Sequence, residues 1–321
     1  MSVSRSPLSA DRGLLYLLLS AASWGTAGAA AALLFGSSGL GPVALTFWRS
    51  AGGTALLLLL RLLRRRPAGP TRALDLAVNG TGLTLFQIAY FEAVHATGLA
   101  VGTVVTLGAA PVLVALGAGL LLRERLGGAG AVAVLGALGG LAVLILGGTG
   151  AGTTVRVPGV LWALLSAAGY ACITLYGRAT AARPGPRPDA LTTTLHSFLI
   201  GSVLLLPFAL AEGLWPSQHH LGRTLVVLLY LAAVPTVLGY ALYFAGVTAV
   251  RATTAAVIAL IEPVSATVLA VTLFGERLAP ATLAGAALLL LSVTALAVAE
   301  TRQAAAVRAR RSPHRPCRPA R

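Results

Sequence analysis

Residues 13–24 read GLLYLLLSAASW, and residues 159–170 read GVLWALLSAAGY. The two stretches share their opening glycine and the core Leu-Leu-Ser-Ala-Ala, and both are almost wholly apolar. Further matches follow: Ala-Leu-Thr at 44–46 recurs 146 positions later at 190–192, and Glu-Arg-Leu at 124–126 recurs 152 positions later at 276–278. A duplication of this length in an apolar chain is typical of membrane transporters built from two halves, which bind their ligand where the halves meet.

The composition favours a membrane protein. The chain has 321 residues, of which 57% are hydrophobic and only 10% are charged. Residues 13–48 carry no formal charge at all. Because one helical span needs about 20 apolar residues, this stretch alone is long enough for nearly two spans. The sequence therefore predicts an all-α integral membrane protein.

Breaks in the apolar pattern divide the chain into ten expected transmembrane helices. Glycine-rich turns at 36–39 and 147–150 and the charged, proline-containing segments at 64–67 and 183–188 separate them. We expect a first repeat over 13–147 and a second over 157–299, between an N-terminal segment at 1–12 and a basic tail at 300–321. The expected spans are 13–35, 41–61, 73–94, 99–122, 128–147, 157–178, 190–211, 222–245, 252–274 and 279–299.

The arginines predict how these spans are oriented. All 24 cationic residues are arginines. With the N-terminus in the cytoplasm, twenty arginines fall in cytoplasmic segments, three outside and one, Arg49, within a span. This asymmetry follows the positive-inside rule and predicts a multi-pass plasma-membrane protein with both termini in the cytoplasm.

The odd number of spans in each half has a further consequence. Five spans reverse the side on which the chain emerges, so the second half enters the membrane in the opposite direction to the first. The fold class predicted is two inverted five-helix repeats. Such a pair has two nearly equivalent packings, one open to each side, which is the physical basis of alternating access.

Other classes of partner find little support. The net charge of +15 comes from short runs between apolar segments, which is typical of cytoplasmic loops and not of a nucleic-acid-binding surface. Cys172 and Cys317 lie far apart and indicate neither a disulfide framework nor a metal site. No cofactor is expected. The tail at 300–321 is polar and basic, which predicts disorder and contact with membrane lipid at most.

Three stretches resemble the drug/metabolite transporter superfamily, in particular its EamA-type members. They are Phe-Trp-Arg-Ser-Ala at 47–51, Pro-Val at 111–112 followed by Arg-Glu-Arg-Leu at 123–126, and Glu-Pro-Val at 262–264 followed by Phe-Gly-Glu-Arg-Leu at 274–278. The similarity covers roughly residues 13–299, and Arg123 departs from the pattern where the second half has Gly275. The resemblance implies a ten-helix bundle that moves small organic metabolites, without specifying one substrate.

Two charges are expected inside the membrane. Arg49 lies about 12 Å below one boundary and Glu262 about 15 Å above the other, at 1.5 Å per residue in a core about 30 Å thick. A charge at this depth needs a reason. One hypothesis pairs Arg49 with Glu262, and the pair either faces the substrate or is purely structural.

Pro111 and Pro263 lie in corresponding spans near mid-membrane. A proline frees a backbone carbonyl, and paired interruptions of this kind point to a binding site. A packing kink without a ligand is the alternative. Glu262, next to Pro263, is also a candidate proton carrier. Glu92 and His95 share a helix face near the outer end of span three and form either a gate, a proton site or a water-exposed pair.

Aromatic and amide side chains recur between the halves. Trp24 corresponds to Tyr170, Tyr90 to Tyr243, and Gln87 to Tyr240. These residues combine an apolar body with a polar tip and suit a cavity for an amphipathic metabolite, although a duplication would also preserve ordinary packing residues of a bundle.

The sequence thus predicts a secondary transporter of small organic molecules that works by alternating access. Amino acids or related compounds are the expected substrates, and export is the expected direction. A proton is a candidate coupling ion. A nucleotide-driven motor is excluded because the chain has no lysine for a phosphate loop. A drug or nucleotide-sugar transporter of the same fold is the alternative, and an integral membrane enzyme would need a catalytic constellation that the motifs do not provide. Nothing distinguishes a monomer from a homodimer.

Overall fold

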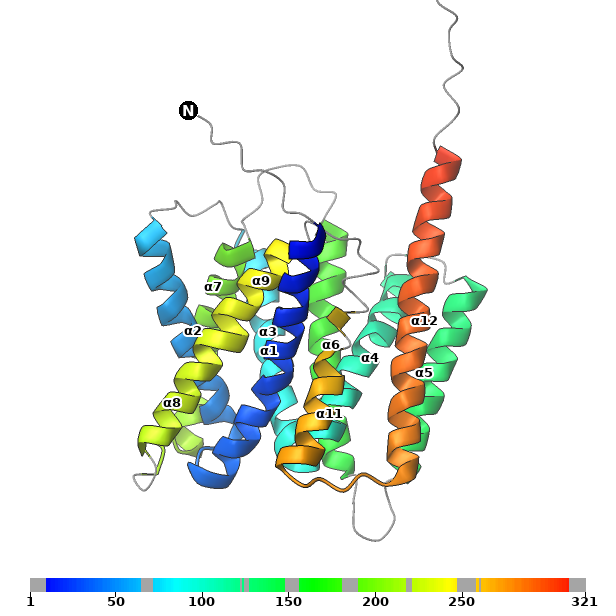
Figure 1. Ribbon diagram of the computed structural model, residues 1–321. Coiled ribbons are helices and arrows are strands. Elements are labelled where there is room, and N and C mark those ends of the chain that lie inside the picture. Colours follow the sequence, from blue (N-terminus) through cyan, green and yellow to red (C-terminus); the bar gives the residue numbers. More distant parts are fainter. Residues whose placement is uncertain are drawn as a thin grey trace, which may run out of the picture.

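The computed structural model describes residues 10–64, 72–121, 123, 127–147, 156–180, 190–217, 221–246, 258–259 and 261–311. Its regular elements in these ranges are all helical, as the apolar runs predict (Figure 1). In chain order they are α1 (Ala10–Ser37), α2 (Pro42–Arg64), α3 (Ala73–Thr97), α4 (Leu99–Leu121), α5 (Gly128–Gly147), α6 (Val157–Thr180), α7 (Ala190–Glu212), α8 (Leu221–Leu231), η2 (Ala232–Leu238), α9 (Gly239–Gly246), α11 (Ile261–Leu273) and α12 (Pro280–Arg311).

The helices have the length and surface of membrane spans. Within the described ranges, seven are long and apolar enough to cross a bilayer, and the segments Gly128–Leu144 and Ile261–Leu273 are shorter apolar helices. Large apolar side chains face outward, among them Leu120, which is 82% exposed. In water this surface would be unfavourable, whereas in a bilayer it contacts lipid tails. The chain is therefore a multi-pass membrane protein.

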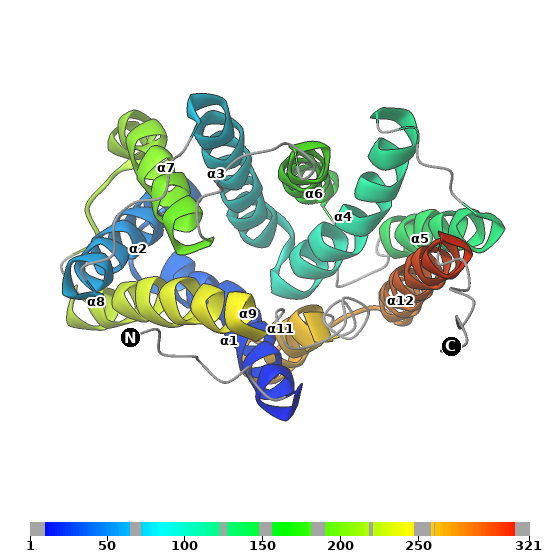
Figure 2. The ribbon, with the colours of Figure 1, turned by 90° about the horizontal axis from the view of Figure 1, so that it is seen from above.

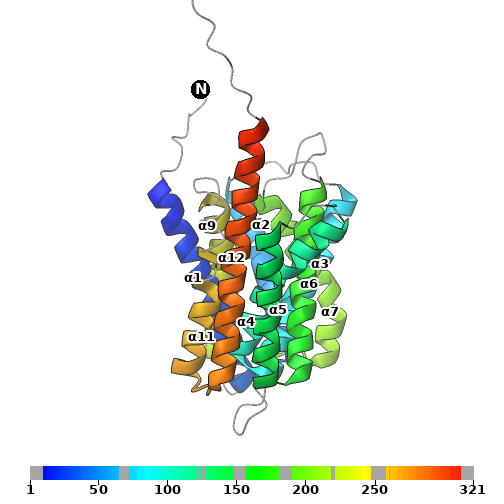
Figure 3. The same ribbon diagram turned by 90° about the vertical axis from the view of Figure 1, so that its right-hand side faces the viewer.

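Three helix pairs join the two halves in antiparallel contact. The end of α7 lies at the start of α2, because Glu212 accepts a hydrogen bond from the Ala44 amide. The end of α11 lies at the start of α4 in the same way. Helices α5 and α12 pack most extensively of all and run side by side (Figure 3). Each helix of these pairs has the same position in its own half.

Apart from α5 and α12, the helices form two layers. We call α3, α4, α6 and α7 the first layer, and α1, α2, α8–η2–α9 and α11 the second layer (Figure 2). In the first layer α6 packs on α3 and α4, while α7 packs on α3. In the second layer α1 packs on α9 and α11, while η2 packs on α2. Exchanging the two halves of the sequence converts each of these contacts of one layer into a contact of the other.

A hydrogen bond repeats with the sequence as well. Ser20 Oγ in α1 donates to the carbonyl of Gly239, and Ser166 Oγ in α6 donates to the carbonyl of Phe86, at 2.9 and 2.6 Å. Ser20 and Ser166 occupy the same place in the duplicated stretch that opens each half. The duplication therefore preserves a specific contact between helices, in addition to the apolar pattern.

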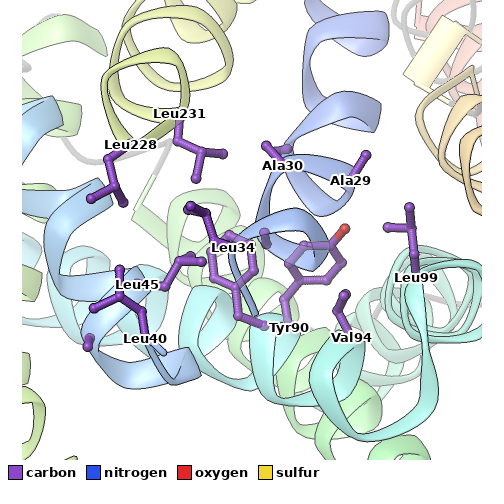
Figure 4. Packing of buried hydrophobic residues seen from close by; sticks show 14 of the residues in the cluster. Ala29, Ala30, Leu34, Leu40, Leu45, Tyr90, Val94, Leu99, Leu228 and Leu231 are labelled. Carbon is purple, nitrogen blue, oxygen red and sulfur yellow. The ribbon is translucent and has the colours of Figure 1, made fainter. Parts of the chain in front are cut away.

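The end of the bundle where α1 begins and α12 ends is called the near end, and the opposite end the far end (Figure 1). An apolar cluster packs the two layers together in the half toward the far end (Figure 4). Leu34 and Leu45 of the second layer are 1% and 0% exposed, and they pack with Tyr90, Val94 and Leu99 of the first layer.

Two details add to or correct the sequence expectations. Arg123 has a positive φ of 54°, close to the 63° of its repeat counterpart Gly275. The arginine thus adopts the left-handed conformation that glycine adopts most readily after a helix. In addition, α12 continues to Arg311, beyond the expected boundary at 299, where composition predicts disorder (Figure 3). Alanine, glutamine and arginine in this extension are strong helix formers, which explains its helicity.

Candidate functional site

Trp24 on α1 lies at the centre of an aromatic group in the second layer. Its ring centroid is 5.3 Å from that of Tyr240 and 5.2 Å from that of Tyr243, both on α9. The indole Nε1 donates a 2.8 Å hydrogen bond to the carbonyl of Pro235. Since Trp24 is fixed at its polar tip and along its ring, α1 and α9 are held in one register.

The carbonyl groups near Pro235 need these partners because the helix is irregular there. Pro235 lies in the π-helical turn η2 and cannot donate to the carbonyl of Leu231 four residues earlier. The π-helical turn pairs a carbonyl with the amide five residues later instead, and the hydroxyl of Thr236 also donates to the Leu231 carbonyl at 2.9 Å. The interruption is therefore satisfied inside the protein, as a membrane span requires.

Arg49 on α2 reaches this interruption. Its side chain is only 6% exposed, and Nε donates a 3.0 Å hydrogen bond to Thr236 Oγ1. The guanidinium carbon lies 5.5 Å from the ring centroid of Phe91 on α3, within cation–π range. Among the described residues neither Nη group has a hydrogen-bond partner, so both remain available to a ligand.

Glu262 on α11 is close enough to interact with Arg49. The two groups lie near each other, and Tyr90 and Tyr240 also lie near Arg49. Within the described part of the chain Arg49 and Glu262 do not form a direct ion pair. The hypothesised pairing is therefore at most an interaction of longer range.

The first layer contributes Gln87, Tyr90 and Tyr170. Tyr90 OH forms a 3.0 Å hydrogen bond with Thr103 on α4. Gln87, one turn before Phe91, is 2% exposed, and its Oε1 has no hydrogen-bond partner in the described structure. Tyr170 on α6 is 39% exposed, and its ring lies 5.7 Å from that of Phe86.

Tyr170 connects the two layers. Its phenol lies near Tyr240, Tyr243 and Glu262, which all belong to the second layer. The structure therefore brings Arg49, Glu262, Trp24 and the tyrosines into one group between the layers. The members of this group, which we call the central polar group, are Trp24, Arg49, Tyr90, Tyr170, Tyr240, Tyr243 and Glu262.

Both predicted prolines lie in helices. Pro111 is half-buried in the middle of α4, and Pro263 is buried in α11. Beside Pro263, the Ser265 hydroxyl donates to the carbonyl of Glu262. A Cβ on Gly25 of α1 would lie 3.0 Å from that carbonyl, so α1 and α11 approach closely at the central polar group.

Glu92 and His95 are separate from the central polar group. They interact electrostatically with each other, and Glu92 also interacts with Glu212 at the far end. The His95 ring lies 5.0 Å from Phe35 in an edge arrangement and is exposed. Among the described residues no group of three His, Cys, Asp or Glu is arranged to hold a metal ion.

Sequence reasoning missed Thr236, Pro235 and Phe91. The dipeptide Pro235-Thr236 inside an apolar span was a usable signal, because a proline there requires a substitute donor for the freed carbonyl. Phe91 offered no such signal, since a phenylalanine in a membrane span is ordinary. Only the fold places its ring against the guanidinium.

Comparison with known proteins identifies the family. The model of the EamA-like transporter family matches residues 11–146 and again 157–298, one match to each half. The chain therefore belongs to the EamA-like transporter family. It is a multi-pass membrane transporter and not an enzyme, and its family implies a small-molecule substrate and a lipid environment.

Several relatives and a solved structure agree with this assignment. The chain is 31% identical over 293 residues, 90% of this chain and 95% of the relative, to an uncharacterized transporter, YwfM, of Bacillus subtilis. It is 31% identical over 178 residues, 53% of this chain and 56% of the relative, to a probable amino-acid metabolite efflux pump of Salmonella typhimurium. A crystal structure with 21% identity, covering 91% of this chain and 99% of the other, has the same fold with a TM-score of 0.59.

Proposed function

We propose that this protein is a secondary transporter that exports amino acids or related small metabolites by alternating access. The observation that carries the proposal is the location of the central polar group. Arg49 and Glu262 lie in one layer and Tyr90 and Tyr170 in the other. A solute bound between the layers would contact both, so a change in their relative tilt would change the side from which it is reached.

Ten spans in two inverted repeats form the framework of this mechanism. Helices α2, α4 and α5 each run antiparallel to their sequence counterparts α7, α11 and α12, as inversion requires. The repeated bonds of Ser20 and Ser166 agree with the same symmetry. Because inverted halves exchange the two layers, a conformation closed at one end has a nearly equivalent partner closed at the other.

The chemistry of the central polar group favours a small amphipathic substrate that carries charge. The Nη donors of Arg49 suit a carboxylate, and Glu262 suits an ammonium group. The rings of Trp24 and Tyr240 offer an apolar face beside them. An amino acid has these features, and one relative is named a probable amino-acid metabolite efflux pump.

The same proposal includes topology and coupling. Both termini are placed in the cytoplasm of a plasma-membrane protein on the basis of the arginine asymmetry, so the near end is cytoplasmic. Glu262 is the proposed proton carrier, because it is the carboxyl group within the central polar group. Glu92 and His95 are secondary candidates, since they lie toward the far end.

The test is transport by the purified protein in proteoliposomes. A panel of amino acids and cationic drugs is offered with and without an imposed pH gradient, and proton movement is followed with a pH-sensitive dye. We expect saturable amino-acid movement that is driven by the gradient and loses its proton coupling in Glu262→Gln. Absence of movement for the whole amino-acid panel, with drugs transported instead, would overturn the proposed substrate class. Undiminished proton coupling in Glu262→Gln would exclude the proposed carrier.

A further inference from the structure

Two glutamates cap the N-termini of two helices, and each glutamate belongs to the opposite layer from the helix that it caps. Glu212, the last residue of α7, accepts hydrogen bonds from the backbone amides of Val43 and Ala44 in the first turn of α2, at 3.3 and 2.7 Å. The first amides of a helix have no partner within the helix and carry its positive dipole end. A carboxylate with one oxygen on each amide satisfies both.

The second glutamate makes the same contact on another pair. Glu276, in the connection after α11, accepts hydrogen bonds from the amides of Leu99 and Ala100 at the start of α4, at 2.7 and 3.2 Å. Its own backbone amide is fixed by the carbonyl of Ala270 at 3.0 Å. We call the Glu212 and Glu276 contacts the two acid clasps.

Glycine makes room for each carboxylate. Gly41 and Gly98 precede the clasped helices, and their carbonyls accept the first helical bonds from Leu45 and Gly102. They occupy the position that usually supplies a capping side chain. A Cβ on Gly41 would collide with the Glu212 carboxylate, and one on Gly98 would lie 3.0 Å from that of Glu276. The cap is therefore supplied from another helix in both cases.

Both acid clasps lie at the far end and join the two layers. The Glu212 clasp holds α7 of the first layer to α2 of the second, and the Glu276 clasp holds α11 of the second layer to α4 of the first. Beneath them lies the apolar cluster of Leu34, Leu45 and Val94 (Figure 4). Opening the far end would separate these four helices and expose the cluster.

We propose that the two acid clasps are the latch of the far-end gate: they hold the layers together when that end is closed and release when it opens. The proposal rests on the alternating access proposed above. It assigns to Glu212 and Glu276 a role in the conformational equilibrium and none in contacting the substrate. Each clasp is local to one helix start, so the layers can part without unfolding any helix.

The first experiment measures opening directly. In a background with Cys172 and Cys317 replaced by alanine, Val94→Cys places a thiol at a position that is 4% exposed. Its reaction with a maleimide is followed in membranes, without any substrate. We expect Glu276→Gln or Glu212→Gln to raise the rate of maleimide labelling about tenfold, because the backbone amides at the helix start then lose their charged acceptor. Arg277→Gln, an exposed change of charge on the same connection, should leave the rate unchanged.

The second experiment replaces a clasp with a covalent link. Gly41→Cys with Glu212→Cys puts two thiols where the clasp was, to be joined by a short bifunctional thiosulfonate that forms a disulfide with each thiol. The bridged protein should lose transport in proteoliposomes and regain it on reduction. Transport by each single variant should not change when the reagent is added. This measurement remains decisive if a glutamine variant fails to accumulate.

The outcomes separate the latch from the transport proposal. Full transport by the bridged protein, or equal labelling of the Val94→Cys thiol with and without Glu276→Gln, would contradict the latch even if transport is established. Conversely, faster labelling in both glutamine variants supports the latch even if the substrate panel contains no transported compound.

Discussion

Arg49 is the residue on which the site depends most. It is a buried cation held by one hydrogen bond to Thr236 and one ring contact with Phe91. Burying a charge at this depth of the membrane costs free energy unless a partner group compensates it. The spare Nη donors suggest that the compensating partner is the substrate itself, which would explain why the charge is retained.

Arg49 should therefore be replaceable by neither leucine nor lysine. Lysine keeps the charge but loses the planar fork and the Nε bond to Thr236. We expect transport to fall by about tenfold or more in Arg49→Lys and to vanish in Arg49→Leu, at similar expression. Initial rates in proteoliposomes check this, and full transport by Arg49→Leu would remove the residue from the mechanism.

Gln87 offers a sharper test, because structure and function make opposite demands on it. Its Oε1 is buried without a partner in the described residues, and such a group costs about 1–3 kcal/mol. Gln87→Leu should therefore raise the melting temperature in detergent while raising the KM for the substrate.

Thr106→Val is the matched control for Gln87→Leu. Thr106 Oγ1 is likewise buried without a partner in the part of the chain described, but Thr106, unlike Gln87, is not among the predicted substrate-binding residues. The control should be stabilised without any change in KM. An unchanged KM in Gln87→Leu would show that the amide does not contact the substrate.

Among the elements, α5 and α12 depend on glycine. A Cβ on Gly285 would lie 2.5 Å from the backbone nitrogen of Leu144, and one on Gly140 would lie 2.7 Å from that of Leu289. Lipid tails are as apolar as the side chains, so helices in a membrane associate through close packing, which small residues at the contact allow. The two backbones therefore leave no room for a larger residue.

Gly285→Val should destabilise the protein by roughly 1–3 kcal/mol, the usual cost of overpacking. Gly139→Val is the control, because a Cβ on Gly139 meets nothing within 4 Å. Thermal unfolding in detergent followed by tryptophan fluorescence measures both. Equal melting temperatures would mean that α5 and α12 separate more readily than their contact indicates.

Element positions were predictable because their signals are local. Apolar runs and their breaks indicated where helices lie, and the duplicated stretch at 13–24 and 159–170 predicted which helices correspond. The charged members of the central polar group were predicted from the cost of a charge in a membrane, and the aromatic members from their recurrence between the two halves. The π-turn at Pro235, the cation–π contact and the acid clasps were not, because they depend on which helices meet. Glu212 in particular looked like an ordinary charge at a span boundary.

In the whole molecule, an inverted repeat places equivalent positions of the two halves on opposite sides of the membrane. Asp11 and Val157 occupy equivalent places before the duplicated stretch, and both are exposed. Asp11 lies at the near end at the start of α1, and Val157 begins α6 at the far end, where the Arg156 amide contacts Thr97.

The most direct measurement is labelling of Asp11→Cys and Val157→Cys, each alone in the chain without Cys172 and Cys317, by a maleimide that cannot cross the membrane of intact cells. The inverted repeat predicts that the Val157→Cys thiol reacts in intact cells and that the Asp11→Cys thiol reacts only after the membrane is permeabilised. Reaction of both thiols from the same side would contradict the inverted arrangement and, with it, the mechanism built on it.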